Sequence, residues 1–203
     1  MYITIVLNLV PFYLGASRGS IFALFIPFIY MMVAKSNATF ILRSIFIGAL
    51  ATFLLYYIDL SIGSGFFDRL LGTTDAAASK SGSGARLYIW EEALEQFLQY
   101  PFFGDMLQTK NVDKYPHNII LEVLQALGFL GFLPLMLLFV RAFSVCGKIF
   151  RHHSQLAWVP VIFIQAFVQN MFSGAIYTAS WMWTSMALLF AIKYYFKREE
   201  GIL

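Results

Sequence analysis

Three residues whose side chains could do chemistry lie beside apolar stretches of the sequence: Arg18, Arg86 and His117. Arg18 lies in a Ser-Arg-Gly reversal between two apolar runs, and Arg86 follows a Ser-Gly-Ser-Gly segment at the start of a predicted helix. A guanidinium beside free backbone N–H groups at a helix start is typical of phosphate or pyrophosphate binding. His117 opens another apolar run, and because an imidazole titrates near neutral pH it can accept a proton from an attacking hydroxyl.

Each of these residues also has a structural explanation. Arg18 could extend its charged head to lipid headgroups, and Arg86 could be a solvated side chain on an exposed helix. His117 could be an interfacial histidine whose neighbour Asn118 caps the following helix. Glu122, further along that helix, could support His117, although a separation of five residues is not the best-facing spacing on a helix.

The composition indicates what kind of chain positions these residues. Of 203 residues, 60% are hydrophobic and 12% are charged, and the mean hydropathy is +0.71. Soluble chains are about 45–50% apolar and about 25% charged, so we expect an all-α integral membrane protein. Cys146 is the single cysteine, which excludes an intrachain disulfide and a thiolate metal site. We expect no metal ion and no cofactor.

Six apolar runs predict about six transmembrane helices, each of which needs about 20 residues to span a bilayer. The runs are 3–16, 20–34, 39–58, 118–140, 156–177 and 178–196. The first two are short for a span. We therefore expect three helices over 1–58, one large loop over 59–117, and three helices with a short tail over 118–203.

Basic residues give this arrangement an orientation. Eight of them fall on one side: Lys35, Arg43, Arg141, Lys148, Arg151, Lys193, Lys197 and Arg198. The positive-inside rule predicts that this side, with both chain termini, is cytoplasmic. The segment 59–116 on the other side holds eight acidic and five basic residues, so we expect an extracytoplasmic loop with net negative charge.

The extracytoplasmic loop is expected to contain a short helix near 85–100. Apolar residues recur there at helical spacing, and Pro101 would end the helix. The residues of this stripe are Leu87, Trp90, Leu94, Phe97 and Leu98. A connection of this length with its own helix is more often functional than a simple connector.

Three motifs occur in a fixed order along the first two thirds of the chain. The first is Ser17-Arg18-Gly19; the second runs from RLYIW, which starts at Arg86, to YPFFG, which ends at Gly104. The third is His117-Asn118 opening a run that contains LGFLG. This order resembles the O-antigen ligase and O-antigen polymerase family of integral membrane glycosyltransferases of the GT-C type.

The resemblance implies a metal-independent enzyme that uses undecaprenyl-pyrophosphate-linked glycans at the outer face of the bacterial inner membrane. Transfer to a lipid A–core acceptor would make it a ligase, and transfer to another repeat unit a polymerase. Arg18 and Arg86 would hold the pyrophosphate, and His117 would deprotonate the acceptor hydroxyl, with Asn118 and Glu122 as supporting residues. The expected partners are the glycan donor, the glycan or lipid A–core acceptor and membrane lipids, and no nucleic acid.

Family members are usually much longer and have more spans, so the resemblance predicts that this chain is a C-terminal portion. Its partners would then include missing N-terminal spans or a chain-length regulator. Two other functions remain open: a membrane transporter or channel, and a non-catalytic membrane subunit or fragment. A transporter would place ionisable residues at mid-bilayer, whereas the runs here hold Glu122 near one end and amides in 156–177.

Overall fold

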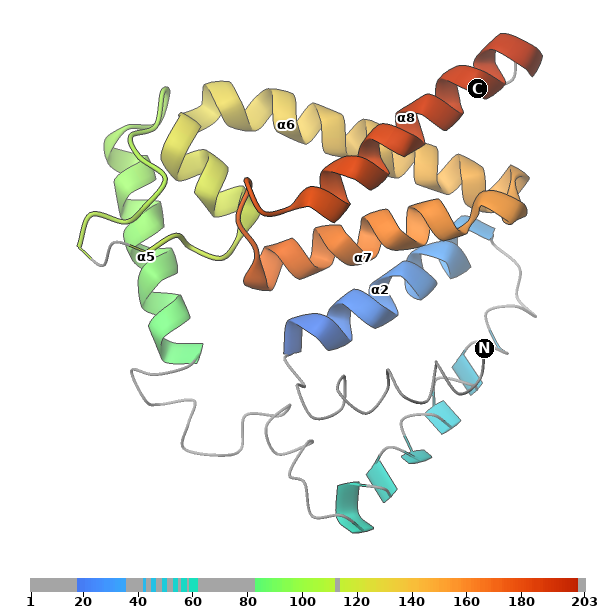
Figure 1. The fold of residues 1–203 in the computed structure, drawn as a ribbon. Coiled ribbons are helices and arrows are strands. Elements are labelled where there is room, and N and C mark those ends of the chain that lie inside the picture. The colour runs from blue at the N-terminus through green and yellow to red at the C-terminus, as the bar shows by residue number, and fades with distance from the viewer. Residues whose placement is uncertain are drawn as a thin grey trace.

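The fold is a helical bundle with one helix standing at its end (Figure 1). The computed structural model describes residues 18–35, single positions between 42 and 61, and residues 83–111 and 114–200. Outside this part lie the expected run 3–16, most of the expected run 39–58, and residues 62–82. The elements are α2 (Arg18–Lys35), α5 (Ser83–Gln99), α6 (Ile119–His152), the short η2 (Ser154–Leu156), α7 (Trp158–Ser173) and α8 (Ser180–Glu200). Every element in the described part is a helix, which confirms the all-α prediction.

One helix among the described residues, α6, is both long and apolar enough to cross a membrane. Shorter apolar helices are Phe25–Ala34 within α2 and the whole of α7. Large apolar side chains such as Val33 and Leu137 are exposed by 70% and 60%, as expected of surfaces that contact lipid. The number of spans and the sidedness of the loops stay predictions.

The bundle core lies where α6 meets α2, α7 and α8. Phe139, Phe163 and Met182 are fully buried there. Edge-to-face aromatic contacts join the helices, with the rings of Phe139 and Phe167 centred 5.0 Å apart; such pairs add about 0.5–1.5 kcal/mol beyond their burial. The hydroxyl of Tyr30 donates to the backbone carbonyl of Phe143 at 2.7 Å, which ties α2 to α6.

Helix α6 does not match the predicted run 118–140, because it continues to His152. Arginine and lysine are good helix formers, so the charges after Val140 lower the hydropathy without ending the helix. The helix also bends sharply near its start (Figure 1). Gly128 lies at the bend with φ 57° and ψ −159°, a backbone region that is essentially restricted to glycine.

The loop after α5 inserts into the backbone hydrogen bonds of α6 at this bend. In a regular helix the N–H of Phe129 would donate to the carbonyl of Gln125. Here Phe129 donates to the carbonyl of Pro101 at 2.8 Å, while the Gln125 carbonyl accepts from the N–H of Asp105 at 2.9 Å. The bend therefore leaves both backbone groups satisfied, and it fixes the loop on the helix.

Two glycines permit this close approach. A Cβ atom at Gly104 would lie 2.3 Å from the carbonyl carbon of Ala126, and one at Gly128 would lie 2.5 Å from the carbonyl carbon of Phe102. Both glycines also have positive φ values. The YPFFG and LGFLG motifs are thus the two halves of one backbone contact.

Helix α5 begins and ends within two residues of the helix expected over 85–100, but its apolar stripe forms the buried face only in part. Within the stripe, Leu87 and Leu98 are 58% and 66% exposed, whereas Phe97 is buried and its ring meets Phe129 of α6; Ala93, which lies outside the stripe, is also buried. Apolar residues occur on more than one side of α5, so spacing alone could not select the packed side.

Candidate functional site

The candidate site lies at the turn that leads into α6. Asn118 is the N-cap residue of this helix, with an extended backbone at φ −143° and ψ 112°. Its side-chain oxygen accepts from the N–H groups of Ile120 at 3.0 Å and Leu121 at 3.2 Å. The helix therefore starts where the sequence predicts, and Asn118 caps it.

His117 has a strained backbone. It is the one non-glycine residue with positive φ among those that the structure describes, at 54°. Such a conformation costs about 1–3 kcal/mol and persists where the surroundings impose it, often at functional sites. The imidazole packs against Tyr115, with ring centroids 4.4 Å apart and planes inclined by 56°. The imidazole thus lies against an aromatic ring, and its backbone directly precedes the residue that caps α6.

Helix α5 is joined to this turn through Trp90. The indole N–H of Trp90 donates to the carbonyl of Pro116 at 2.7 Å. Arg86 precedes Trp90 by four residues in α5, so the two positions share one face of the helix. The side chain of Arg86 lies outside the described part of the chain.

Arg18 occupies the first position of α2, and its side chain also lies outside the described part. One turn further along α2, the ring of Phe22 stacks on Phe172 with centroids 5.7 Å apart. Phe172 is next to the end of α7, from which the chain continues into the linker 174–179. Arg18 thus lies one helical turn before Phe22, which contacts α7. Arg86 lies one helical turn before Trp90, which bonds to the carbonyl of Pro116, next to His117. The meeting of Arg18, Arg86 and His117 in one cavity stays a prediction.

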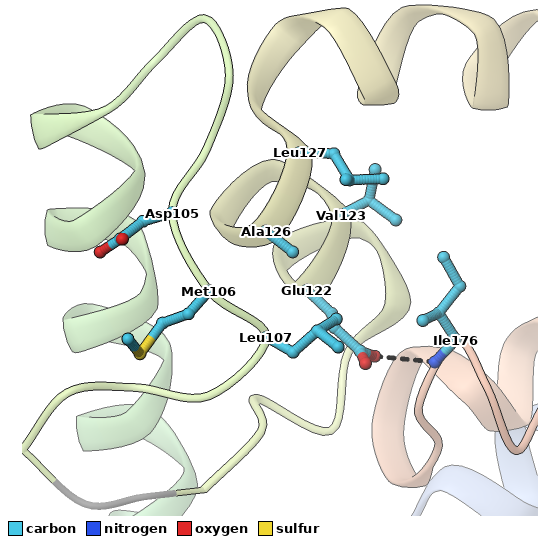
Figure 2. Close-up of a pocket in the computed structure, with 8 residues that line it drawn as sticks. All are labelled: Asp105, Met106, Leu107, Glu122, Val123, Ala126, Leu127 and Ile176. Carbon is cyan, nitrogen blue, oxygen red and sulfur yellow. Dashed lines mark hydrogen bonds between the residues drawn. The ribbon is translucent and has the colours of Figure 1, made fainter.

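Glu122 connects the start of α6 to the α7–α8 linker. Its side chain is completely buried, and Oε2 accepts from the backbone N–H of Ile176 at 2.8 Å (Figure 2). The other carboxyl oxygen, Oε1, is buried and has no hydrogen-bond partner. These contacts do not test the predicted support of His117 by Glu122. They show instead that Glu122 binds the α7–α8 linker, which the sequence did not suggest.

The linker 174–179 falls within the expected runs 156–177 and 178–196 but is not helical. The hydroxyl of Thr178 accepts from the N–H of Ala175 at 3.1 Å, which closes a turn. The indole N–H of Trp183 donates to the carbonyl of Ile176 at 2.8 Å. Because Glu122 binds the N–H of the same residue, the peptide groups on both sides of Ile176 are fixed.

Two adjoining pockets open beside Glu122 and share the side chains of Met106 and Leu107. The first has a volume of about 340 Å³ and mainly apolar walls (Figure 2). The second has a volume of about 370 Å³. Both volumes are typical of small-molecule sites. Residues found in one pocket only are Asp105, Val123, Ala126, Leu127 and Ile176 in the first, and Gln108, Tyr115 and Tyr177 in the second.

Polar side chains of α5 and α6 hold the loop after α5, whose residues 105–108 line these pockets. The Nζ atom of Lys110 lies 2.6 Å from Oδ2 of Asp105, and this hydrogen bond raises the pKa of the Lys110 ammonium above its ordinary value. The amide of Gln96 donates to the same oxygen at 3.3 Å, and Gln125 donates to Gln96 at 3.4 Å. Asp105 thus fixes the loop through both its side chain and its backbone.

Several residues around this site could not be recognised in the sequence. Tyr115 stands two residues before His117, and this proximity to a candidate base was the one available signal. Tyr177 reaches Tyr115 with ring centroids 6.1 Å apart, but the two are distant in the chain. Trp90 was assigned to an apolar stripe, and its hydrogen bond to Pro116 depends on a contact between separate elements.

The described residues contain no group of three His, Cys, Asp or Glu side chains arranged to hold a metal ion. A family model described as O-antigen ligase matches residues 3–136, more than half of the chain. No curated protein and no solved structure matches the chain.

Proposed function

Because the chain belongs to the O-antigen ligase family, we propose that it transfers an undecaprenyl-pyrophosphate-linked glycan to an acceptor hydroxyl. The family match over 3–136 includes Arg18, Arg86 and His117. The observation that carries these roles is the 2.7 Å hydrogen bond from Trp90 to Pro116. It joins the helix that contains Arg86 to the strained turn that contains His117.

His117 would act as the general base. Its imidazole accepts the proton of the acceptor hydroxyl while the hydroxyl oxygen forms a bond to the anomeric carbon of the glycan. The bond between that carbon and the pyrophosphate oxygen breaks, and its electron pair leaves with undecaprenyl pyrophosphate. Support comes from the backbone of His117, whose strained conformation is fixed by the Asn118 cap and by the ring of Tyr115.

Arg18 and Arg86 would neutralise the negative charge that develops on the leaving pyrophosphate. Arginine suits this role because its planar guanidinium stays charged and binds phosphate oxygens in pairs. Two such cations supply the charge stabilisation for which other enzymes use a metal ion, so the proposed reaction is metal-independent. Arg18 is the first residue of α2 and Arg86 lies in the first turn of α5, where free N–H groups also favour an anion.

In this proposal the loop over 59–117 lies on the outer side of the bacterial inner membrane and both termini lie in the cytoplasm.

The acceptor decides whether the enzyme is a ligase or a polymerase. Glycan profiling of a deletion strain distinguishes the two: single repeat units indicate a polymerase, whereas full chains that are absent from the lipid A core indicate a ligase.

The test of the base is His117→Ala. We expect at least an approximately 100-fold loss of glycan transfer, within the range for removal of a general base, with a normal amount of protein in the membrane. His152→Ala is the matched control, since His152 is exposed at the far end of α6 and should keep full activity. Full transfer by the His117→Ala variant rules out the role.

A further inference from the structure

The pocket of about 370 Å³ beside the His117 turn has the chemistry of a sugar site. Its walls include two tyrosine rings, from Tyr115 and Tyr177, and two polar side chains, from Gln108 and Glu122. Tyrosine offers an apolar ring face and a hydroxyl in one side chain. A pocket with such walls and a few convergent polar groups is typical of ligand sites.

Glu122, which lines this pocket, has one carboxyl oxygen without a hydrogen-bond partner. Oε1 of Glu122 is buried without a hydrogen bond, although Oε2 of the same carboxyl group is satisfied by Ile176. An unsatisfied buried acceptor costs about 1–3 kcal/mol, and native proteins contain few of them. Oε1 can therefore accept one more hydrogen bond, which a ligand could supply.

The pocket adjoins the proposed base. Tyr115 lines the pocket, and its ring centroid lies 4.4 Å from that of His117. Tyr177 stands on the opposite linker, with its ring centroid 6.1 Å from that of Tyr115. A sugar in this pocket would present its hydroxyl groups to Glu122 while one edge lies next to the imidazole.

We propose that this pocket binds the acceptor sugar, and that the free carboxyl oxygen of Glu122 accepts a hydrogen bond from one of its hydroxyl groups. This assignment rests on the proposed glycan transfer. Tyr115 and Tyr177 pack against the C–H surfaces of the sugar, and Gln108 supplies further hydrogen bonds. Glu122 is then a positioning residue for the acceptor, and the donor pyrophosphate binds elsewhere.

Glu122→Gln separates this role from a purely structural one. The amide keeps one carbonyl oxygen, which can still accept from the N–H of Ile176, but it replaces the free oxygen by an NH₂ donor. If Glu122 only fixed the linker, the variant would behave like the wild-type chain. If it binds a sugar hydroxyl, the variant loses the charged acceptor, and the hydroxyl is left with a weaker, reversed hydrogen bond from a neutral NH₂ group.

The experiment measures the KM of the acceptor and, separately, its equilibrium binding to the purified full chain. Two probes are used: lipid A–core oligosaccharide and an undecaprenyl-pyrophosphate-linked repeat unit. For Glu122→Gln we expect a KM and a Kd at least about ten times higher for one of the two probes, with the donor KM unchanged; tenfold corresponds to about 1.4 kcal/mol. Glu91→Gln makes the same change at an exposed position of α5 and should have no effect.

A second variant covers the case in which Glu122→Gln fails to fold. Tyr177 is 66% exposed, so Tyr177→Leu should leave the fold intact and weaken binding of the same probe several-fold. Tyr194→Leu is its control, because Tyr194 is 70% exposed on α8 and lines neither pocket.

The outcomes distinguish this inference from the proposed function. Wild-type binding of both probes by the Glu122→Gln and Tyr177→Leu variants overturns the acceptor site, even where glycan transfer is established. Binding of neither probe by the wild-type chain overturns it as well. Absence of transfer with variant-sensitive binding rejects the proposed reaction and supports the sugar site. The probe that responds identifies the acceptor as lipid A–core or as a repeat unit.

Discussion

The backbone of His117 is left-handed, and the next residue, Asn118, is extended and caps α6. A cap bond satisfies N–H groups that a helix start otherwise leaves free. Asn118 therefore stabilises the helix and also fixes the position from which the imidazole projects. Strain and capping act at adjacent residues, so a change at Asn118 should affect both stability and catalysis.

Asn118→Ala should destabilise the chain by about 1 kcal/mol, the usual loss for an N-cap. Asn118→Asp should stay close to the wild type, because aspartate caps equally well. The measurement is the thermal unfolding temperature in detergent, read by circular dichroism. An alanine variant that unfolds at the wild-type temperature would show that the cap contributes nothing.

At the scale of elements, the position of α5 depends on the backbone exchange between the 101–105 loop and the bend of α6. Helix α5 carries Arg86 and the indole that binds Pro116. The bend at Gly128 opens the hydrogen bonds that the loop uses. One glycine conformation thus helps to set where α5 lies relative to His117.

Gly128→Ala should displace this loop. An alanine in this region of φ and ψ costs on the order of 1–3 kcal/mol, and its Cβ would meet backbone atoms at 2.5 Å, which cannot move like a flexible side chain. We expect a lower unfolding temperature, faster proteolysis between residues 99 and 117, and loss of glycan transfer.

Gly147→Ala is the matched control on the same helix. Its Cβ would lie 3.3 Å from the hydroxyl oxygen of Tyr30, and alanine is the better helix former. Its proteolysis pattern should remain that of the wild type. Equal sensitivity of the two variants would show that the bend is not what holds the loop.

At the scale of the whole molecule, the exposed apolar surfaces of α2 and α6 require lipid around the bundle. The orientation in that lipid is a prediction that rests on the basic residues alone. The proposed reaction at the outer face depends on it, because α5 and His117 must lie on the side where the lipid-linked glycan is presented.

Cysteine labelling tests this orientation. Cys146 is completely buried, so the wild-type chain should not react with a membrane-impermeant maleimide. Glu95→Cys, at an exposed position of α5, should react in intact spheroplasts, whereas Ser154→Cys, at an exposed position of η2, should react only after permeabilisation. The reverse pattern would invert the predicted topology and remove the proposed site from the outer face.

The class of the chain, the helical fold and the start of α6 could all be predicted from the sequence. Composition excludes a soluble domain, and an asparagine before an apolar run is a local capping signal. Arg18, Arg86 and His117 could be named as candidates because their types and neighbours suggest anion binding and proton transfer. All of these conclusions rest on local chemistry, which a linear sequence contains.

Only the tertiary structure decided the bend at Gly128, the buried face of α5 and the partner of Glu122. Each depends on a contact between residues far apart in the chain: Gly128 with Phe102, Phe97 with Phe129, and Glu122 with Ile176. Helical periodicity shows that a residue repeats on one face, but the packing of a second element decides which face is buried. The Tyr115–Tyr177 pocket arises for the same reason, since its walls come from segments that meet only in the folded chain.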